Sequence, residues 1–176
     1  MEWAVALYPA LPLFIVAESM GGCVALLATL PHTRTSAHVA GCVLLAPMCT
    51  LHPKLELHPI TRAAVMALSR WLPWLPVVPN GGDLGVRVSR DPEAVRVLAD
   101  DPLVYKAPAR IGTIAAGLVA MERLQACMHQ VSVPFIVMHG DGDVITSPAG
   151  SEMLYQRAAS SDKAFKARCL GATECD

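Results

Sequence analysis

Residues 11–30 read LPLFIVAESMGGCVALLATL, two apolar runs separated by the short segment ESMGG. The first run is brief and uninterrupted, which is typical of a strand covered on both faces, and we expect this strand at Leu13–Ala17. The second run, Gly21–Leu30, has the length of a helix and ends at Pro31. A strand that passes directly into a helix through a serine and two glycines predicts that the serine lies at the carboxyl end of a sheet.

Ser19 occupies the turn between this strand and this helix. The context is that of a nucleophile elbow, G-x-S-x-G, in which a sharp turn pushes the serine hydroxyl outward. Ala17 replaces the first glycine of the pattern and adds a single methyl group. The backbone N–H of Met20 would then face the oxyanion that develops when the serine attacks a carbonyl. The alternative is a serine that caps the N-terminus of a glycine-rich helix.

The rest of the chain continues the alternation of strand-like and helix-like stretches, which predicts an α/β architecture. Further strands are expected at Val39–Ala46 and Phe135–His139. A proline- and glycine-rich loop is expected at Leu75–Gly85. We interpret the region between the second and third strands as a helical insertion within one domain. Helices are expected at Pro59–Leu75, from Pro92 behind an N-cap at Asp91, at Ile111–Met128, and from Pro148 to about Ala159.

Composition excludes several classes of protein. The 176 residues are 53% hydrophobic and 16% charged, which is incompatible with a disordered tail. A formal net charge of −1 provides no basic field for nucleic acid. The six cysteines at positions 23, 42, 49, 127, 169 and 175 show no zinc or disulfide-scaffold spacing, so we expect them to be mostly reduced and buried. No motif for a cofactor or a metal ion is recognised.

The N-terminal region predicts neither a membrane span nor a secretory leader. The longest stretch of low polarity runs from Trp3 to Ala17, which is shorter than the ~20 residues that a helix needs to cross a bilayer. Glu2 stands where a signal peptide would carry basic residues. We therefore expect a cytoplasmic chain, with peripheral membrane contact left open.

A second chemical signal follows the strand at Phe135–His139. Asp141 and Asp143 come after its end, which suits the acid in the chain order serine, acid, histidine. A solvated turn is the alternative, and a calcium site is a weaker one because other oxygen ligands are lacking. His139 ends the strand and is interpreted as structural. No histidine follows Asp143, since the six histidines are at positions 32, 38, 52, 58, 129 and 139.

Five segments together resemble the monoacylglycerol lipase-like branch of the α/β-hydrolases, which includes plant lysophospholipases and caffeoylshikimate esterases. They are LPLFIVAESMGGCVAL, GCVLLAPMC, DPLVYKAPARIGT, VSVPFIVMHGDGD and LYQRAASSDKAFK. The resemblance implies that Ser19 is the nucleophile, that Met20 provides an oxyanion-hole amide, and that Asp143 rather than Asp141 is the triad acid. It also implies a cap at about Leu51–Met128. The candidates within this cap for side chains that line an acyl chain are Trp71, Leu72, Trp74 and Leu75. The alternative is that these four side chains belong to the ordinary core.

The chain departs from this family at both ends. Only ten residues precede Leu11, so the strands that the family places before the elbow are absent. After Lys166 the likeness stops, and aligning Gly171 with the family's glycine puts Glu174 where the triad histidine is expected. We therefore expect residues 1–176 to form a single partial domain, the C-terminal part of an α/β-hydrolase sheet with its cap, truncated at both ends.

Two functions follow from this combination. The first is a serine ester hydrolase acting on a lipid-like or phenolic ester through an acyl-enzyme, with slow turnover because the histidine is missing. The second is a non-catalytic remnant of the fold that binds lipid or a protein partner. The missing strands would also leave a sheet edge exposed, through which the chain could self-associate. Whether the chain is an enzyme stays open at this point.

Overall fold

The computed structural model describes residues 2–78, 89 and 91–168. Two compact units make up the chain. One comprises residues 1–54 together with 120–176, and the other comprises residues 55–119. The first carries a parallel sheet and the proposed chemistry, and the second is mostly helical. Within the described part of the chain, no helix is both long and apolar enough to span a membrane.

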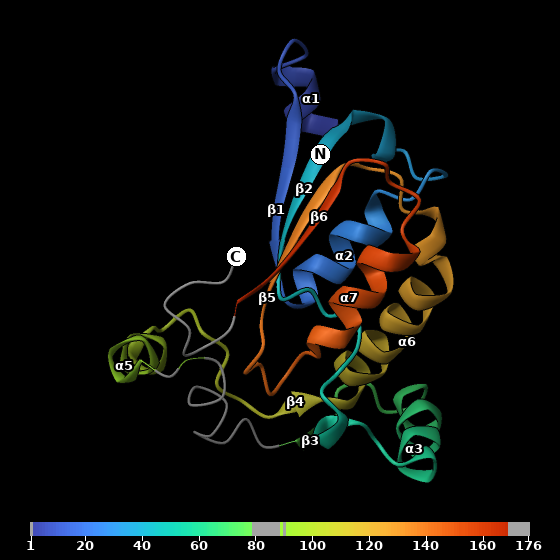
Figure 1. Cartoon of the computed structure of the whole chain (residues 1–176). Coiled ribbons are helices and arrows are strands. Elements are labelled where there is room, and N and C mark those ends of the chain that lie inside the picture. Colours follow the sequence, from blue (N-terminus) through green and yellow to red (C-terminus); the bar gives the residue numbers. More distant parts are fainter. Residues whose placement is uncertain (1, 79–88, 90, 169–176) are drawn as a thin grey trace. The chain divides into compact units, whose positions relative to one another are not determined.

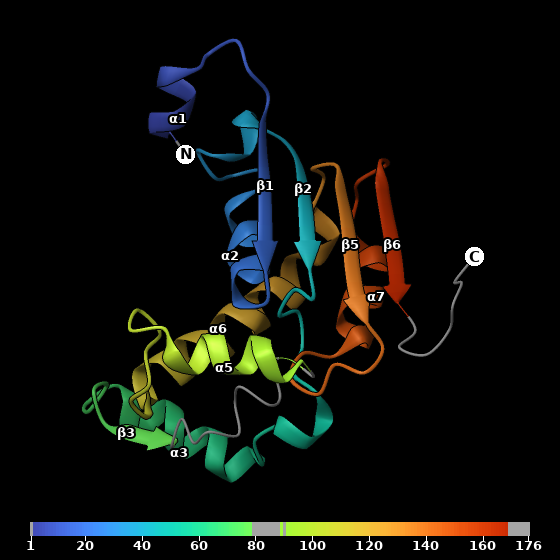
Figure 2. The same ribbon diagram turned by 90° about the vertical axis from the view of Figure 1, so that its left-hand side faces the viewer.

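The sheet of the first unit has four strands in the order β1-β2-β5-β6 (Figure 2). All three neighbouring pairs are parallel. The carboxyl ends of the strands therefore meet at one edge of the sheet, where loops that follow different strands come together. The strands are β1 (Leu13–Glu18), β2 (Val39–Leu45), β5 (Phe135–Gly140) and β6 (Lys163–Arg168).

Helices α2 (Met20–Ala28) and α7 (Pro148–Arg157) cover one face of this sheet, together with the C-terminal end of α6 (Ile111–Cys127) (Figure 1). The core lies between these helices and the strands. Each fully buried leucine or valine there contributes about 1.5–3 kcal/mol relative to an exposed one. The core side chains with no exposed surface include Leu26, Leu44, Leu124, Val137 and Leu154.

The opposite face of the sheet is open at β1, where the side chains of Phe14 and Val16 are 60% and 71% exposed. The Phe14 ring lies over Gly41 of β2, where a Cβ atom would be 3.1 Å from the ring. Parallel sheets are normally covered on both faces. Among the described residues, β1 also has no strand paired to its outer edge. The first unit thus exposes apolar surface that a parallel sheet ordinarily buries.

The second unit contains α3 (Pro59–Ser69), α5 (Pro92–Asp100) and the first turns of α6. Strands β3 (Pro76–Val78) and β4 (Ala109–Arg110) pair antiparallel. Helix α5 begins as predicted, because the Asp91 carboxylate accepts a hydrogen bond of 2.9 Å from the Glu93 N–H. The remaining short elements, which lie at the chain start and in connections, are α1 (Glu2–Leu7) and 3-10 turns at Ser36–His38, Pro53–Leu55 and Met128–Gln130.

The expected strands and helices occur with small shifts at their ends, and three differences stand out. Helix α3 ends at Ser69 rather than Leu75. Strand β3 occupies part of the expected loop, and residues 79–85 of that loop lie outside the described residues. Strand β6 was not predicted. Its segment KAFKAR alternates charged and apolar residues and lacks the continuous apolar run that marks β1 and β5.

Helix α2 packs closely against the loop after β2 at Gly22. A Cβ atom at this position would be 2.6 Å from the Pro47 Cβ and 2.9 Å from its Cα. Gly21, next to it in the same helix, has nothing within 4 Å of a built Cβ. We expect Gly22→Ala to lower the free energy of unfolding by about 1–3 kcal/mol, the usual cost of overpacking. Gly21→Ala is the matched control and should leave stability unchanged or slightly raised, because alanine favours a helix.

Urea unfolding followed by circular dichroism would compare these two variants. Equal stability of both would contradict the close packing of Gly22 on Pro47.

Candidate active site

Ser19 lies between the last residue of β1 and the first residue of α2, in a backbone conformation with φ 50° and ψ −121°. A positive φ is uncommon for a residue other than glycine and costs about 1–3 kcal/mol, so the surrounding structure must hold it. Its N–H donates to the Leu45 carbonyl at 2.9 Å. Its own carbonyl accepts from the N–H groups of Gly22 at 3.0 Å and Met48 at 2.8 Å.

The Ser19 side chain does not cap α2, although the residue stands at the N-cap position. No residue in the described part of the chain hydrogen-bonds to its hydroxyl, which is partly exposed. The alternative interpretation, a serine kept for helix capping, is therefore wrong. A strained turn that presents a hydroxyl without a partner is the local geometry of a nucleophile elbow.

The loop after β2 packs against the turn at Ser19. Met48 donates to the Ser19 carbonyl, and Pro47 packs against Gly22. Ala46 has a positive φ of 42°, which turns the chain sharply at the end of the strand. These contacts leave room for only a glycine at position 22, which explains the second glycine of ESMGG.

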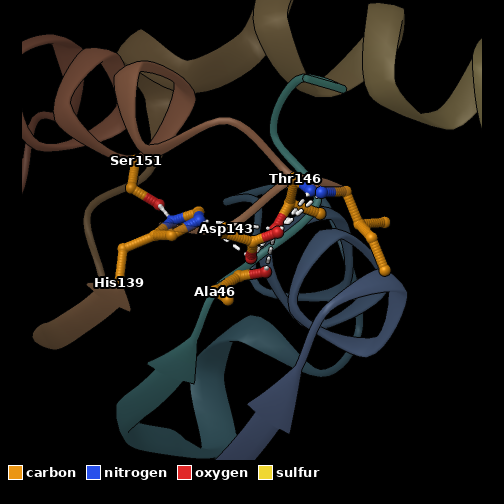
Figure 3. A network of polar contacts seen from close by, with 6 residues as sticks. Ala46, His139, Asp143, Thr146 and Ser151 are labelled. Carbon is orange, nitrogen blue, oxygen red and sulfur yellow. Dashed lines mark hydrogen bonds and ion pairs between the residues drawn. The ribbon is translucent and has the colours of Figure 1, made fainter. Parts of the chain in front are cut away.

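Asp143 follows β5, and its carboxylate accepts several hydrogen bonds (Figure 3). Oδ1 accepts from the backbone N–H of Ile145 at 2.8 Å and of Thr146 at 3.0 Å. Oδ2 accepts from the Thr146 hydroxyl at 2.7 Å. Burial raises the pKa of Asp143, but these hydrogen bonds and the nearby His139 outweigh it, and the net pKa is below its usual value. The carboxylate is thus ionised at neutral pH.

His139 contacts the same carboxylate from the buried side. Its Nε2 lies 3.3 Å from Asp143 Oδ2, and its side chain has no exposed surface. Burial lowers the pKa of His139, and Asp143 only partly counteracts this effect. Sequence reasoning interpreted His139 as structural and missed its contact with the acid, although the four-residue spacing from Asp143 is visible in HGDGD.

Ser151 of α7 completes a second serine–histidine–aspartate series, because its Oγ lies 2.7 Å from His139 Nδ1. Ser151 has no exposed surface, and His139 is 2% exposed. No substrate can reach either atom, so this series is not a second active site.

Ser19 and Asp143 lie at the same carboxyl edge of the sheet, after β1 and β5, with β2 between them. Two strand spacings correspond to roughly 10 Å. Among the described residues no hydrogen bond joins the two side chains. The loop after β2 contacts the neighbourhood of each, because the Ala46 carbonyl oxygen lies 3.3 Å from the Thr146 hydroxyl oxygen and the Met48 N–H donates to the Ser19 carbonyl.

Three buried cysteines among the described residues offer no competing nucleophile. Burial raises the pKa of Cys23 and Cys42 to about 11 and that of Cys49 to about 12, so these thiols are poor nucleophiles. Cys127 is also free, and Cys169 and Cys175 lie outside the described residues, as do Gly171 and Glu174. In the ranges described, no three histidine, cysteine or acidic side chains are grouped as metal ligands.

The oxyanion-hole candidate Met20 is the first residue of α2, and its side chain is 56% exposed. The predicted cap residues Trp71 and Trp74, in the second unit, are 79% and 61% exposed, so they are not core residues. His58 accepts a hydrogen bond from the Ile60 N–H and caps α3.

The chain is similar to known proteins over most of its length. The family model described as "Serine aminopeptidase, S33" matches residues 1–168. The chain is 29% identical to human monoglyceride lipase over 159 residues and 30% identical to Arabidopsis thaliana caffeoylshikimate esterase over 162 residues. Each match covers 90% of this chain, but only 50% and 47% of the relative. The chain therefore spans about half the length of the curated relatives it matches.

Solved structures show the same fold. A soluble variant of Saccharomyces cerevisiae monoglyceride lipase matches with a TM-score of 0.80 at 22% identity, covering 96% of this chain and 57% of that one. The Paleococcus ferrophilus monoacylglycerol lipase matches with a TM-score of 0.78 at 24% identity, covering 96% and 63%.

The lowered pKa of His139 predicts a specific pH dependence of stability. The usual pKa of histidine is 6.5, and the buried imidazole of His139 stays neutral in the folded chain below this value. The unfolded chain therefore binds more protons than the folded chain once the pH falls below 6.5. The free energy of unfolding should therefore be undiminished above pH 6.5 and fall as the pH drops below it. His139→Gln should flatten this part of the curve, whereas His129→Gln, at an exposed site, should not.

Chemical denaturation at a series of pH values would measure both variants. An unchanged acid limb in His139→Gln would contradict the buried neutral imidazole.

Proposed function

Because the chain belongs to the serine aminopeptidase S33 family of α/β-hydrolases, we propose that it carries the nucleophile and the acid of a serine ester hydrolase of the monoacylglycerol lipase type. The observation that carries this proposal is the strained turn at Ser19, with a hydroxyl that has no partner among the described residues, at the sheet edge that also bears Asp143.

In the proposed reaction, the Ser19 hydroxyl oxygen attacks the ester carbonyl, and the alcohol leaves to give an acyl-serine. The Met20 N–H, at the N-terminus of α2, stabilises the negative oxygen of the tetrahedral intermediate. Water then attacks the acyl-serine and releases the acid. Asp143 would hold the imidazole that takes the serine proton and returns it to the leaving alcohol.

The 176 residues contain no histidine after Asp143 to act as this base. His139 does not replace it, because its ring is buried and both nitrogens already have partners. Loss of one triad member slows turnover by about 10⁴- to 10⁶-fold. We therefore propose that these residues by themselves react slowly at Ser19, while Glu174, aligned with the family's histidine, would be a weak proton acceptor.

We propose a lipid-like or phenolic ester as substrate, because relatives of the chain are a monoglyceride lipase and a caffeoylshikimate esterase. The exposed side chains of Trp71, Leu72 and Trp74 suit contact with an acyl chain or a membrane surface. They lie in the unit of residues 55–119, which we equate with the cap expected at about Leu51–Met128. A cytoplasmic chain that touches membranes peripherally is consistent with this assignment.

A second candidate function is binding without turnover. The open face of the sheet at β1 favours it, because Phe14 and Val16 are exposed there. In this case the chain would bind a monoacylglycerol-like lipid or a protein partner through the same fold.

A fluorophosphonate probe distinguishes the two candidates. We expect slow labelling at Ser19, because the hydroxyl is presented but lacks a base, and faster labelling when imidazole is added to the buffer. Ser19→Ala should abolish the label. Asp143→Asn should reduce the acceleration by imidazole, since the carboxylate would no longer orient the added base.

Ser151→Ala is the matched control, because Ser151 belongs to the buried serine–histidine–aspartate series and should not carry the label. Rapid stoichiometric labelling without imidazole would overturn the proposal that the chain is impaired. No labelling under any condition, with retained affinity for monoacylglycerol vesicles, would favour the second candidate.

The open edge at β1 leads to a further expectation. We propose that the chain self-associates through this edge, because Phe14 and Val16 are exposed beside backbone groups that pair with no strand among the described residues. Val16→Lys should shift the chain towards the monomer in sedimentation velocity experiments. Leu103→Lys, at a side chain 92% exposed in the other unit, makes the same chemical change and should not. A wild-type chain that stays monomeric at high concentration would refute self-association.

A further inference from the structure

We infer that His139 is a positioning residue for Asp143, a neutral imidazole whose hydrogen on Nε2 faces both the carboxylate and the Thr146 hydroxyl that binds it, and whose tautomer is held by the hydroxyl of Ser151. The catalytic meaning of this assignment rests on the proposed function, in which Asp143 is the triad acid. The hydrogen-bonding pattern itself rests on the contacts of the buried ring alone.

The Ser151 side of the ring permits two arrangements. Ser151 Oγ lies 2.7 Å from Nδ1, and a hydroxyl can either donate a hydrogen bond or accept one. This contact therefore requires only that one of the two atoms carries the hydrogen, and the opposite side of the ring must decide which.

The other ring nitrogen faces two oxygens. Nε2 lies 3.3 Å from Asp143 Oδ2 and 3.3 Å from Thr146 Oγ1. The Thr146 hydroxyl has one hydrogen, and its shortest contact is with Asp143 Oδ2 at 2.7 Å. Neither oxygen then has a hydrogen to offer Nε2. An unprotonated Nε2 would set its lone pair against a carboxylate, so Nε2 carries the hydrogen and Ser151 donates to Nδ1.

A doubly protonated, charged ring of His139 is less compatible with its buried surroundings. The side chain of His139 has no exposed surface, and a buried cation is costly even beside one carboxylate. Among the described residues, Asp143 is the charged group that contacts the ring, and the ring's other polar contacts are the hydroxyls of Ser151 and Thr146. Burial accordingly lowers the pKa of His139.

With this tautomer, the Asp143 carboxylate is held at both of its oxygens. Oδ1 takes the two backbone N–H groups of Ile145 and Thr146, and Oδ2 takes the Thr146 hydroxyl and lies 3.3 Å from His139 Nε2. Rotation of the carboxylate would break bonds at both oxygens. His139 thus fixes the plane of the acid from the buried side and leaves the partly exposed side, 21% accessible, for a catalytic base.

The tautomer can be measured directly in the unaltered full chain labelled with ¹⁵N-histidine. We expect one ring to show a protonated Nε2 and an unprotonated Nδ1 at neutral pH and to keep this state as the pH is lowered through 6.5. The spectrum of His139→Gln identifies that ring. The signals of the other histidines, such as the exposed His129, provide the internal reference. A hydrogen on Nδ1, or an imidazolium at neutral pH, would overturn the inference.

Two substitutions separate positioning from packing. His139→Gln keeps an N–H donor near the Nε2 position, whereas His139→Leu keeps only bulk. We expect the pKa of Asp143, followed by ¹³C NMR of its carboxyl carbon, to rise in the leucine variant and to remain lower in the glutamine variant. An equal pKa in both variants would show that His139 acts by packing alone and would refute positioning. If the leucine variant does not fold, the tautomer of the unaltered chain still decides.

These measurements are independent of reaction at Ser19. If the fluorophosphonate probe does not label Ser19 but the Nε2–H tautomer is found, the proposed function fails and the hydrogen-bonding assignment stands. If Ser19 is labelled but the ring carries its hydrogen on Nδ1, the positioning role of His139 fails and the hydrolase proposal stands.

Discussion

The site depends on the short loop that follows β2, from Ala46 to Met48. Its last residue donates a hydrogen bond to the carbonyl of Ser19, and the carbonyl oxygen of its first lies 3.3 Å from the hydroxyl oxygen of Thr146, which donates to the Asp143 carboxylate. Pro47, between them, packs against the helix that starts at the serine turn. The strained turn at Ser19 and the segment that binds the acid thus contact the same piece of backbone.

The parallel sheet explains why this loop can serve both sides. Since β1, β2 and β5 run in the same direction, their carboxyl ends share an edge, and β2 lies between the strands that carry the serine and the acid. The loop after β2 is therefore placed between the segments that follow β1 and β5. Among the described residues, the same arrangement leaves β1 at the border of the sheet, where Phe14 and Val16 are exposed, whereas parallel sheets are normally covered on both faces.

The sequence was informative where a local pattern coincides with the tertiary role. Strands β1, β2 and β5 are continuous apolar runs, and the segment ESMGG between a strand and a helix identifies Ser19 without knowledge of the fold. Strand β6 escaped prediction because Lys163 and Lys166 interrupt its apolar residues. The Ser151 contact could not be foreseen either, because only the packing of α7 on β5 brings its hydroxyl to His139, twelve residues earlier.

The buried cysteines have a practical consequence for this molecule. Cys23, Cys42 and Cys49 have no more than 3% exposed surface, and burial holds their thiols in the protonated form. An alkylating reagent can reach them only when α2 or the loop after β2 moves away from the sheet. The rate at which these sulfurs become alkylated, measured by mass spectrometry, would thus report transient opening around the serine turn without any engineered cysteine.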